Sequence, residues 1–361
     1  MLGFIFLPAT GIAAFYLATA CRRLIAFSRR PLTLSSEFLP SFTVLKPIAG
    51  LEPDLQENLA SFCDQDYPGF YEVVFCLRAE NDPALEVVER IMREFPNCHA
   101  QIALGENADL MNPKIANIAK PGVAARSDVI VIADSDIRVG RDYLRALASS
   151  FEGAKVGAVT CLYSGSPNDT IASRLGALGI DDGFAPSVLV ALVIGELRFC
   201  LGATMAVRRS VLEALGGLAA LGHTFADDHE LGQLVTKHGY GVELSRYVVT
   251  TTIAETRVFG LLSHELRLAR NDFEIARGGY LFSFLVYGLP LALVYLAVTL
   301  DTAIGLPLLA AIVLLRVALH YLARYALGVK SRDDVLLIPL RDFLSLGVWA
   351  ASIFGRRRSF R

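Results

Sequence analysis

The chain has 361 residues, of which 53% are hydrophobic and 19% are charged, and its mean hydropathy is +0.46. These values exclude an ordinary soluble domain, which is less apolar, and a protein made only of membrane spans, which carries fewer charges. A formal net charge of −2 excludes a protein whose overall charge attracts nucleic acid. The six cysteines form no CxxC pair, which argues against a zinc site or a disulfide scaffold and favours a reducing compartment.

The chain opens with an apolar segment, Leu2–Cys21, that contains no charged residue. About 20 residues are enough to cross a hydrocarbon core of roughly 30 Å as a helix. A cleaved signal peptide carries its positive charge before the apolar run, whereas here the charge follows it. We therefore predict a transmembrane anchor, and the positive-inside rule places residue 22 onward in the cytosol. The arginines that follow the segment are Arg22, Arg23, Arg29 and Arg30.

Residues 31 to about 275 alternate short apolar runs with longer amphipathic ones. This alternation, with unbroken β-branched strands, predicts an α/β fold with a doubly wound, mostly parallel sheet. Ligands of such sheets bind beyond the carboxyl ends of the strands. The expected strands are Phe42–Lys46, Glu72–Leu77, His99–Leu104 and Val129–Ala133, and the expected helices are Leu51–Asp64, Pro83–Phe95 and Asn112–Ala125.

Polar residues stand near several of the expected strand and helix ends. Asp82 follows the strand that ends at Leu77, and it is either part of a turn or a residue that holds the base or ribose of a nucleotide. Lys46 and Lys114 are isolated lysines at strand and helix edges, and either could be surface charge. These residues by themselves leave the alternatives open.

Two carboxylates, Asp134 and Asp136, follow the buried strand that ends at Ala133. Neighbouring carboxylates repel each other, so the arrangement costs free energy without a counter-charge. A divalent cation provides one, because carboxylate oxygens suit Mg²⁺ or Mn²⁺, and Mg²⁺ is often shared with substrate phosphates. Such a metal would neutralise the charge that grows on a diphosphate leaving group. A solvated surface loop is the alternative interpretation of this pair.

Two further groups of polar residues follow. Asp227 and Asp228 open an amphipathic segment. Asp227 could simply be a helix N-cap. If the group lies in a cleft, one of its carboxylates could instead be a general base that takes a proton from an attacking hydroxyl. His264 and Arg267 are three residues apart and share a helix face. That face is either a basic, membrane-proximal surface or a phosphate-binding one, because an arginine side chain binds phosphate bidentately.

The last part of the chain is again apolar and contains two candidate spans, Tyr280–Leu300 and Thr302–Leu327. In the second, basic residues recur every four positions and therefore share one face. We expect this face to look into the protein or to snorkel to the interface, rather than to bind a phosphate or a lipid head group. The residues of this face are Arg316, His320 and Arg324.

A fourth apolar stretch, Val335–Phe354, is broken by Arg341 and Asp342 and precedes a basic tail. A full span here would place that tail outside, against the positive-inside rule. We therefore expect an interfacial or re-entrant segment with the tail in the cytosol. The basic residues of the tail are Arg356, Arg357, Arg358 and Arg361.

A series of short motifs follows in order from about residue 40 to 280. The motifs are Val44-Leu-Lys46-Pro-Ile-Ala-Gly50, Gln65-Asp-Tyr-Pro68, Asn81-Asp82-Pro-Ala84, Asn112-Pro-Lys114-Ile115, Ala133-Asp134-Ser-Asp136-Ile-Arg138-Val139, Gly202-Ala-Thr-Met205, Ala226-Asp-Asp228 and His264-x-x-Arg267. The ordered set is far more specific than any one member. It resembles the ceramide glucosyltransferase family, a branch of the inverting glycosyltransferases with the GT-A fold, and it is similar to bacterial enzymes that glycosylate hopanoid lipids.

The resemblance implies a role for each matching residue. Lys46 and Asp82 would line a uridine pocket. Asp134 and Asp136 would hold Mg²⁺ or Mn²⁺ on the diphosphate of a UDP-sugar. Asp228, which matches the third aspartate of the family, would deprotonate the acceptor hydroxyl, so that its oxygen attacks the anomeric carbon with inversion.

The last element of the family, Gln/Arg-x-x-Arg-Trp, is imperfect here. Arg267 is retained, and with Lys114 it would bind the donor phosphates. His264 replaces the Gln or Arg and would assist, whereas Leu268 replaces the Trp. Loss of the indole removes a stacking contact and points to a different acceptor.

The expected protein is therefore an integral membrane enzyme, in a bacterial inner membrane, that moves a hexose from a UDP-sugar to a membrane lipid. Ceramide is the first choice of acceptor, a hopanoid or another lipid is the alternative, and no nucleic acid partner is expected. Residues 1–21 would form the anchor, 22–279 the cytosolic GT-A domain, and 280–361 the C-terminal transmembrane or interfacial helices and tail.

Two rival functions stand beside this one. A processive polysaccharide synthase resembles the same domain, but usually needs more spans and a complete Gln-x-x-Arg-Trp element. A transporter or membrane scaffold that only binds a nucleotide has no need of Asp228. Release of nucleoside diphosphate in the presence of a lipid would distinguish an enzyme from such a binder.

Overall fold

The computed structural model of the chain describes residues 3–35, 37–105, 109–330 and 332–354. Its contacts divide the chain into two compact units. The sheet unit comprises Arg30–Ser166 and Ile194–Thr252, and the helix unit comprises Met1–Arg29, Pro167–Val193 and Ile253–Arg361. Two segments that we expected in the soluble domain, residues 167–193 and 253–279, therefore belong to the helix unit.

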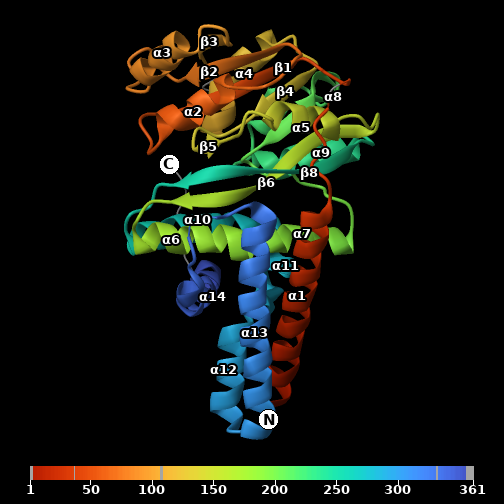
Figure 1. Cartoon of the computed structure of the whole chain (residues 1–361), viewed down its shortest axis with the longest axis vertical. Helices are drawn as coiled ribbons and strands as arrows, with labels where there is room; N and C mark the ends of the chain where they lie inside the picture. The colour runs from red at the N-terminus through yellow and green to blue at the C-terminus, as the bar shows by residue number, and fades with distance from the viewer. Residues whose placement is uncertain (1–2, 36, 106–108, 331, 355–361) are drawn as a thin grey trace. The chain divides into compact units, whose positions relative to one another are not determined.

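Among the described residues the strands form one 8-stranded mixed sheet in the order β3-β2-β1-β4-β7-β6-β8-β5 (Figure 1). Strands β3, β2, β1 and β4 are parallel, as the alternation of elements predicts. Beyond β4 the pairs β4–β7, β6–β7 and β5–β8 are antiparallel, so the sheet is parallel only in its first half. The strands are β1 (Phe42–Ile48), β2 (Tyr71–Leu77), β3 (His99–Leu104), β4 (Val129–Ile132), β5 (Ile137–Arg138), β6 (Val156–Pro167), β7 (Met205–Arg208) and β8 (Gly241–Ile253).

Helices cover both faces of the parallel strands, which explains why these strands are apolar throughout. Alternate residues of β1 enter two separate cores: Val44 belongs to one with Phe62 and Tyr143, and Leu45 belongs to the other with Ile118. All the predicted strands and helices of this region are present. The helices are α2 (Leu55–Cys63), α3 (Leu85–Glu94), α4 (Pro113–Ala124), α5 (Tyr143–Ser150), α8 (Arg209–Ala214), η2 (Leu218–Leu221) and α9 (Asp227–Lys237).

The helix unit consists of long apolar helices, in which α1 packs against α12 and α13 (Figure 1). Helix α10 packs against α14, α6 and α11. The helices are α1 (Gly3–Arg29), α6 (Ile171–Leu178), η1 (Gly179–Phe184), α7 (Ala185–Ile194), α10 (Val258–Ile275), α11 (Arg277–Phe282), η3 (Ser283–Val286), α12 (Gly288–Thr299), α13 (Thr302–Leu327), η4 (Val335–Leu337) and α14 (Ile338–Phe354).

Four helical stretches of the described chain have the length and apolar character of membrane spans, and they indicate a membrane protein. Three coincide with predicted apolar segments: Ile5–Arg29, Thr302–Leu327 and Val335–Phe354. The predicted span Tyr280–Leu300 is instead part of a helix pair, α11–η3 and α12, that bends by 67°. The remaining stretch, Ile171–Ile194, was missed, because its charged residues divide it into short apolar runs.

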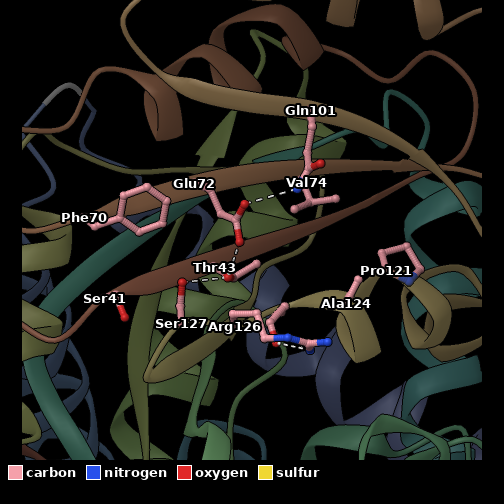
Figure 2. Close-up of a pocket in the computed structure, with 11 residues that line it drawn as sticks. Ser41, Thr43, Phe70, Glu72, Val74, Gln101, Pro121, Ala124, Arg126 and Ser127 are labelled. Carbon is pink, nitrogen blue, oxygen red and sulfur yellow. Dashed lines mark hydrogen bonds between the residues drawn. The ribbon is translucent and has the colours of Figure 1, made fainter.

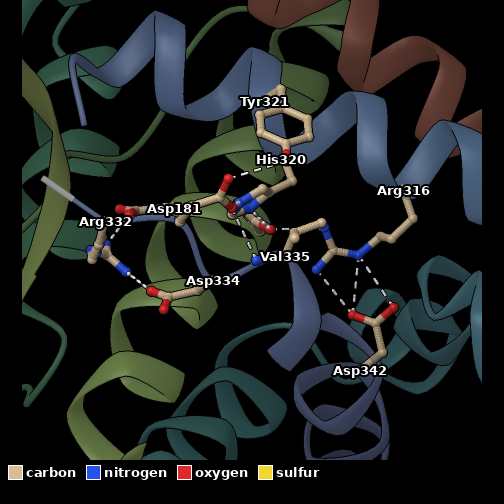
Figure 3. Close-up of polar contacts among 10 residues, drawn as sticks. Asp181, Arg316, His320, Tyr321, Arg332, Asp334, Val335 and Asp342 are labelled. Atoms are coloured by element: carbon tan, nitrogen blue, oxygen red, sulfur yellow. Dashed lines mark hydrogen bonds and ion pairs between the residues drawn. The ribbon is translucent and has the colours of Figure 1, made fainter. Parts of the chain in front are cut away.

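Two of those charges, Asp181 and Asp182, lie in η1, a π-helical turn between α6 and α7, and both are paired. Asp181 binds Arg332, which follows α13 (Figure 3), and Asp182 binds residues of α13. Asp182 Oδ2 accepts a hydrogen bond from Arg316 Nη1 (2.9 Å) and lies 2.9 Å from His320 Nδ1. Asp342 accepts from Arg316 Nε (3.1 Å) and Nη2 (3.0 Å). Arg316 and His320 are buried, which confirms for these two residues that their face looks into the protein.

Helix α14 contains the last predicted apolar segment. Its two charged residues are buried and paired, Arg341 with Glu265 of α10 (2.6 Å) and Asp342 with Arg316 of α13. Pairing explains how two charges are accommodated in an apolar helix. The interfacial position of this segment was inferred from the basic tail, and it stays a prediction. The predicted basic tail, residues 356–361, lies outside the described residues.

Candidate active site

The loops after the parallel strands bring most of the predicted site residues of the sheet unit together. Asp134 and Asp136 follow β4, Lys46 lies near the end of β1, and Lys114 and Asp228 lie in the first turns of α4 and α9. This is the strand edge at which parallel sheets bind ligands. The contacts below show how each side chain is held.

Lys46 is fully buried, so it is not surface charge. Its ammonium group donates to the main-chain carbonyl of Asp134 and lies 3.9 Å from the centroid of the Phe62 ring. Burial lowers the pKa of Lys46 to about 7, against the opposing effect of the Asp136 and Asp134 carboxylates. The lysine therefore supports the loop that carries the two aspartates, and its contact with a uridine stays a prediction.

Asp134 and Asp136 differ in their surroundings. The Asp136 carboxylate accepts a hydrogen bond from Thr251 Oγ1 (2.6 Å), and its loss of solvent, together with the neighbouring Asp134, raises the pKa of Asp136 to about 6. The Asp134 side chain is 38% exposed, and its Oδ1 lies 2.7 Å from Lys114 Nζ. The loop is therefore anchored by buried lysine and threonine side chains, while Asp134 itself is partly exposed, and the metal role of the pair stays a prediction.

Lys114 connects this loop to α9. Its ammonium lies 2.7 Å from Asp134 Oδ1 and 3.2 Å from Asp227 Oδ2. Burial alone would lower the pKa of Lys114, but the Asp134 and Asp227 carboxylates outweigh burial and raise it above its usual value. The lysine thus remains charged between two carboxylates.

Asn112 ties the beginnings of α4 and α9 together. As the N-cap of α4 it accepts from the main-chain amides of Lys114 (3.0 Å) and Ile115 (3.2 Å). Its amide group donates to the Thr224 carbonyl (2.9 Å) and to Asp227 Oδ1 (3.2 Å). Asp227 is therefore not an N-cap, because α9 already begins at this residue and its carboxylate is bound by Asn112 and Lys114.

Gly202 lies between Asp134, the aspartate of the loop after β4, and Asp228, the predicted general base. A methyl group added at Gly202 would lie 3.5 Å from Asp134 Oδ2, 3.7 Å from Asp228 Oδ2 and 4.0 Å from Lys114 Nζ. Burial raises the pKa of Asp228, and the neighbouring Asp227 carboxylate raises it further. A raised pKa suits a carboxylate that accepts a proton during a reaction.

Asp82 joins two turns at the same edge. Its carboxylate accepts from the main-chain amides of Gly50 (3.1 and 3.2 Å) and Ala84 (2.9 Å). Gly50 has a φ of +72°, a conformation that glycine adopts without a steric penalty. Asp82 therefore does serve a turn, and its contact with a nucleotide stays a prediction.

The other two predicted site residues belong to the helix unit. His264 and Arg267 lie on α10, where His264 Nδ1 is bound to the Glu255 carboxylate and Arg267 is exposed. Leu268, at the position of the family Trp, is 48% exposed. Their phosphate role is a prediction that the contacts within the helix unit do not test.

The carboxylates of Asp134 and Asp136 suit a metal ion that also binds the phosphates of a substrate. Among the residues that the structure describes, no group of three or more His, Cys, Asp and Glu side chains converges as a metal site. Asp134 and Asp136 offer two carboxylates, and the absence of a side chain at Gly202 leaves room for a methyl-sized group in contact with Asp134. Mg²⁺ is commonly held by one or two carboxylates plus substrate phosphates, so this donor set suits a metal that binds with a diphosphate.

A cavity of about 400 Å³ opens at the opposite ends of the same strands (Figure 2). There Glu72 accepts from Thr43 Oγ1 (2.6 Å) and Gln101 Nε2 (3.1 Å), and Thr43 also lies 2.9 Å from Ser127 Oγ. None of the predicted site residues lines this cavity. We therefore place the candidate active site at the carboxyl ends, around Gly202.

Sequence reasoning missed three residues of this site: Asn112, Gly202 and Thr251. Asn112 and Gly202 belong to two of the ordered motifs, and their place in these motifs could have identified them as site residues. Thr251 lies on β8, far from Asp136 along the chain, and only the β5–β8 pairing brings the two together.

Comparison with known proteins places this geometry in context. The profile described as "Glycosyl transferase family 21" matches residues 3–361. Ceramide glucosyltransferase 1 of Caenorhabditis elegans is 27% identical over 226 residues, which cover 62% of this chain and 48% of that protein. Ceramide glucosyltransferase of Komagataella phaffii is 38% identical over 117 residues, which cover 31% and 23%. The chain thus spans about half the length of the first relative and less of the second, and the family resemblance predicted from the motifs is confirmed.

A solved structure has the same fold over almost the whole chain. The mannosyltransferase PcManGT from Pyrobaculum calidifontis, in complex with GDP-Man and Mn²⁺, superposes with a TM-score of 0.58 at 18% identity, over 99% of this chain and 100% of that one. At this identity the likeness concerns the fold alone. It confirms the predicted α/β glycosyltransferase fold combined with apolar helices.

Proposed function

Because the chain belongs to glycosyl transferase family 21, we propose that it transfers a sugar from a nucleotide-sugar to a hydroxyl group of a membrane lipid. The observation that carries the proposal is the shared space beside Gly202, which Asp134 and Asp228 face from two sides with Lys114 close by. Donor-phosphate neutralisation on one side and a proton acceptor on the other are what direct displacement of a diphosphate requires.

The proposed donor is a UDP-sugar bound with Mg²⁺ or Mn²⁺. Asp134 and Asp136 would hold the metal, which when bound supplies positive charge to the leaving diphosphate. The neighbour in fold binds GDP-Man and Mn²⁺, which is the same class of donor and metal. Lys46 and Asp82 would contribute to the nucleoside pocket.

Lys114, Arg267 and His264 are the proposed ligands of the donor phosphates. Lys114 is the best supported of them, because it is a charged group on the open side of Asp134. Its position lets it bind a phosphate oxygen where it now binds a carboxylate. Arg267 is exposed and His264 Nδ1 is bound to Glu255, and the phosphate role proposed for both rests on the family resemblance.

In the proposed reaction Asp228 removes the proton from the acceptor hydroxyl. The oxygen attacks the anomeric carbon from the face opposite the diphosphate, a new carbon–oxygen bond forms, and the bond to the diphosphate oxygen breaks with inversion. The proton stays on Asp228 until solvent takes it. Its raised pKa makes Asp228 a better proton acceptor than an ordinary aspartate.

Ceramide is the first proposed acceptor, because the curated relatives are ceramide glucosyltransferases. A hopanoid or another lipid alcohol is the second, because Leu268 replaces the family Trp. The apolar helices suit an acceptor that is insoluble in water. The arginines in the last part of α1 and directly after it support a cytosolic sheet unit. A bacterial inner membrane is the proposed location.

The test is a transfer assay on the purified full-length protein in detergent. It combines Mn²⁺ or Mg²⁺ with labelled UDP-sugars and with ceramide, hopanoid or diacylglycerol in turn. A singly glycosylated lipid formed only with metal would support the proposal and name both substrates. A ladder of polymer products would favour the polysaccharide synthase, and hydrolysis without lipid dependence would contradict lipid transfer.

A further inference from the structure

A second polar cavity of the sheet unit, of about 300 Å³, is lined by hydroxyl and guanidinium side chains. They include Arg30, Arg246, Ser149, Ser150 and Ser245. None of these residues belongs to the candidate active site. We propose that this cavity binds the phosphate group of a membrane phospholipid headgroup, a site that is independent of sugar transfer.

The lining offers the donors that a phosphate needs. Ser245 is buried, and its Oγ lies 3.1 Å from Ser150 Oγ, so two hydroxyl groups stand side by side. Arg30 binds Glu243 at 2.9 Å, but their side chains are 47% and 42% exposed. Exposed ion pairs contribute little stability, so the guanidinium can exchange this partner for a phosphate.

The net charge of the cavity favours a phosphodiester. The residues that line the cavity include two arginines, Arg30 and Arg246, and one carboxylate, Glu243, so the lining itself carries one more positive than negative charge. A phospholipid phosphodiester carries one negative charge, whereas free phosphate near neutral pH carries one to two. The charge balance therefore suits the lipid group better than the free ion.

The position of Arg30 in the chain places the cavity near headgroups. Arg30 directly follows the candidate span Ile5–Arg29, whose last part already carries Arg22 and Arg23. At 1.5 Å per helical residue, Arg29 at the end of α1 lies about 9 Å along the helix beyond Arg23, and Arg30 follows it directly. The headgroup layer begins where the roughly 30 Å hydrocarbon core ends, so this distance keeps Arg30 within or next to it.

The test is native mass spectrometry of the full-length protein released from detergent and titrated with phosphatidylglycerol. We expect the double variant Arg30→Gln/Arg246→Gln to bind the lipid about tenfold more weakly, because charge-assisted hydrogen bonds are lost. Glu243→Gln should bind it more tightly, because a competing carboxylate is removed. The matched control is Arg141→Gln, which removes another exposed arginine with an aspartate partner, Asp64, in the same unit.

Opposite effects of the arginine and glutamate variants would support the site, because misfolding would weaken binding in both. Equal lipid binding by the wild type and the double variant would overturn it. Two competition experiments identify the source of the phosphate group that the cavity binds. Displacement by diacylglycerol, which has no phosphate, or by inorganic phosphate at the same concentration as the lipid, would overturn the phospholipid assignment.

Discussion

At the scale of single residues, the candidate active site balances charges around a glycine. Asp134, Asp227 and Asp228 surround one ammonium group, that of Lys114, so carboxylates outnumber their nearest cation. The excess negative charge and the burial raise the pKa of Asp228 and leave Asp134 open to a second cation. Both properties agree with the roles proposed for these two aspartates.

Asp228→Asn is expected to abolish transfer while leaving donor binding within about threefold of the wild type. The amide keeps the shape of the carboxylate but accepts no proton, and general-base catalysis contributes about 10²–10⁴-fold to a rate. Product formation and calorimetric binding of the UDP-sugar measure the two effects. Glu230→Gln, on the same helix, is the matched control, and normal turnover by Asp228→Asn would remove this residue from the base role.

Gly202→Ala is expected to fold normally and to lose about tenfold or more in transfer rate. The added methyl would make ordinary van der Waals contacts, the nearest at 3.5 Å, yet it would occupy the space between Asp134 and Asp228. Gly232→Ala is the contrasting variant, because its methyl would lie 2.2 Å from the Phe199 Cα and should destabilise the fold. Thermal unfolding and the transfer assay separate the two, and full activity of Gly202→Ala would show that the space is not used.

At the scale of elements, buried charges join the apolar helices. Helices α6 and α7 meet at the π-helical turn η1, which presents Asp182 to α13, and Asp342 of α14 binds the same arginine. Single-turn π-helices occur mostly inside α-helices and often at sites with a specific role. This arrangement lets three separate segments of the chain, α6–η1–α7, α13 and α14, share one network.

Arg316→Met is expected to destabilise the helix unit strongly. Removing one partner of a buried ion pair leaves unpaired charge and costs about 3–5 kcal/mol. Arg324→Met, two turns farther along α13 and less buried, is the control and should have a smaller effect. The thermal unfolding midpoint in detergent is the measurement, and equal midpoints for the two variants would show that the network adds no stability.

At the scale of the whole molecule, the chain combines a sheet unit with the polar chemistry and a helix unit with the apolar surface. The proposed reaction needs both, because a nucleotide-sugar is soluble in water and a lipid acceptor is not. The two units do not follow one another along the chain as an anchor, a domain and a tail would. The chain enters the helix unit a second time at residues 167–193, between β6 and β7.

Removal of divalent metal is expected to weaken donor binding at least tenfold, and Mn²⁺ or Mg²⁺ should restore it. The reason is the diphosphate, whose charge would otherwise face the Asp134 and Asp136 carboxylates. Calorimetry with and without EDTA measures the effect, and Asp134→Ala should bind the donor weakly whether or not metal is present. Donor affinity that EDTA leaves unchanged would count against the metal.

Sequence patterns alone determined the elements that depend on local physics. The four parallel strands, α2 to α4, three of the apolar segments and the Asp134–Asp136 loop were predicted, because hydrophobic periodicity and charge placement act over a few neighbouring residues. The ordered motifs also identified the family. Tertiary structure alone decided the rest. The antiparallel half of the sheet, the helix Ile171–Ile194, the burial of Lys46 and the contacts of Asp227 with Lys114 and Asn112 all depend on partners distant in the chain, which no local pattern specifies.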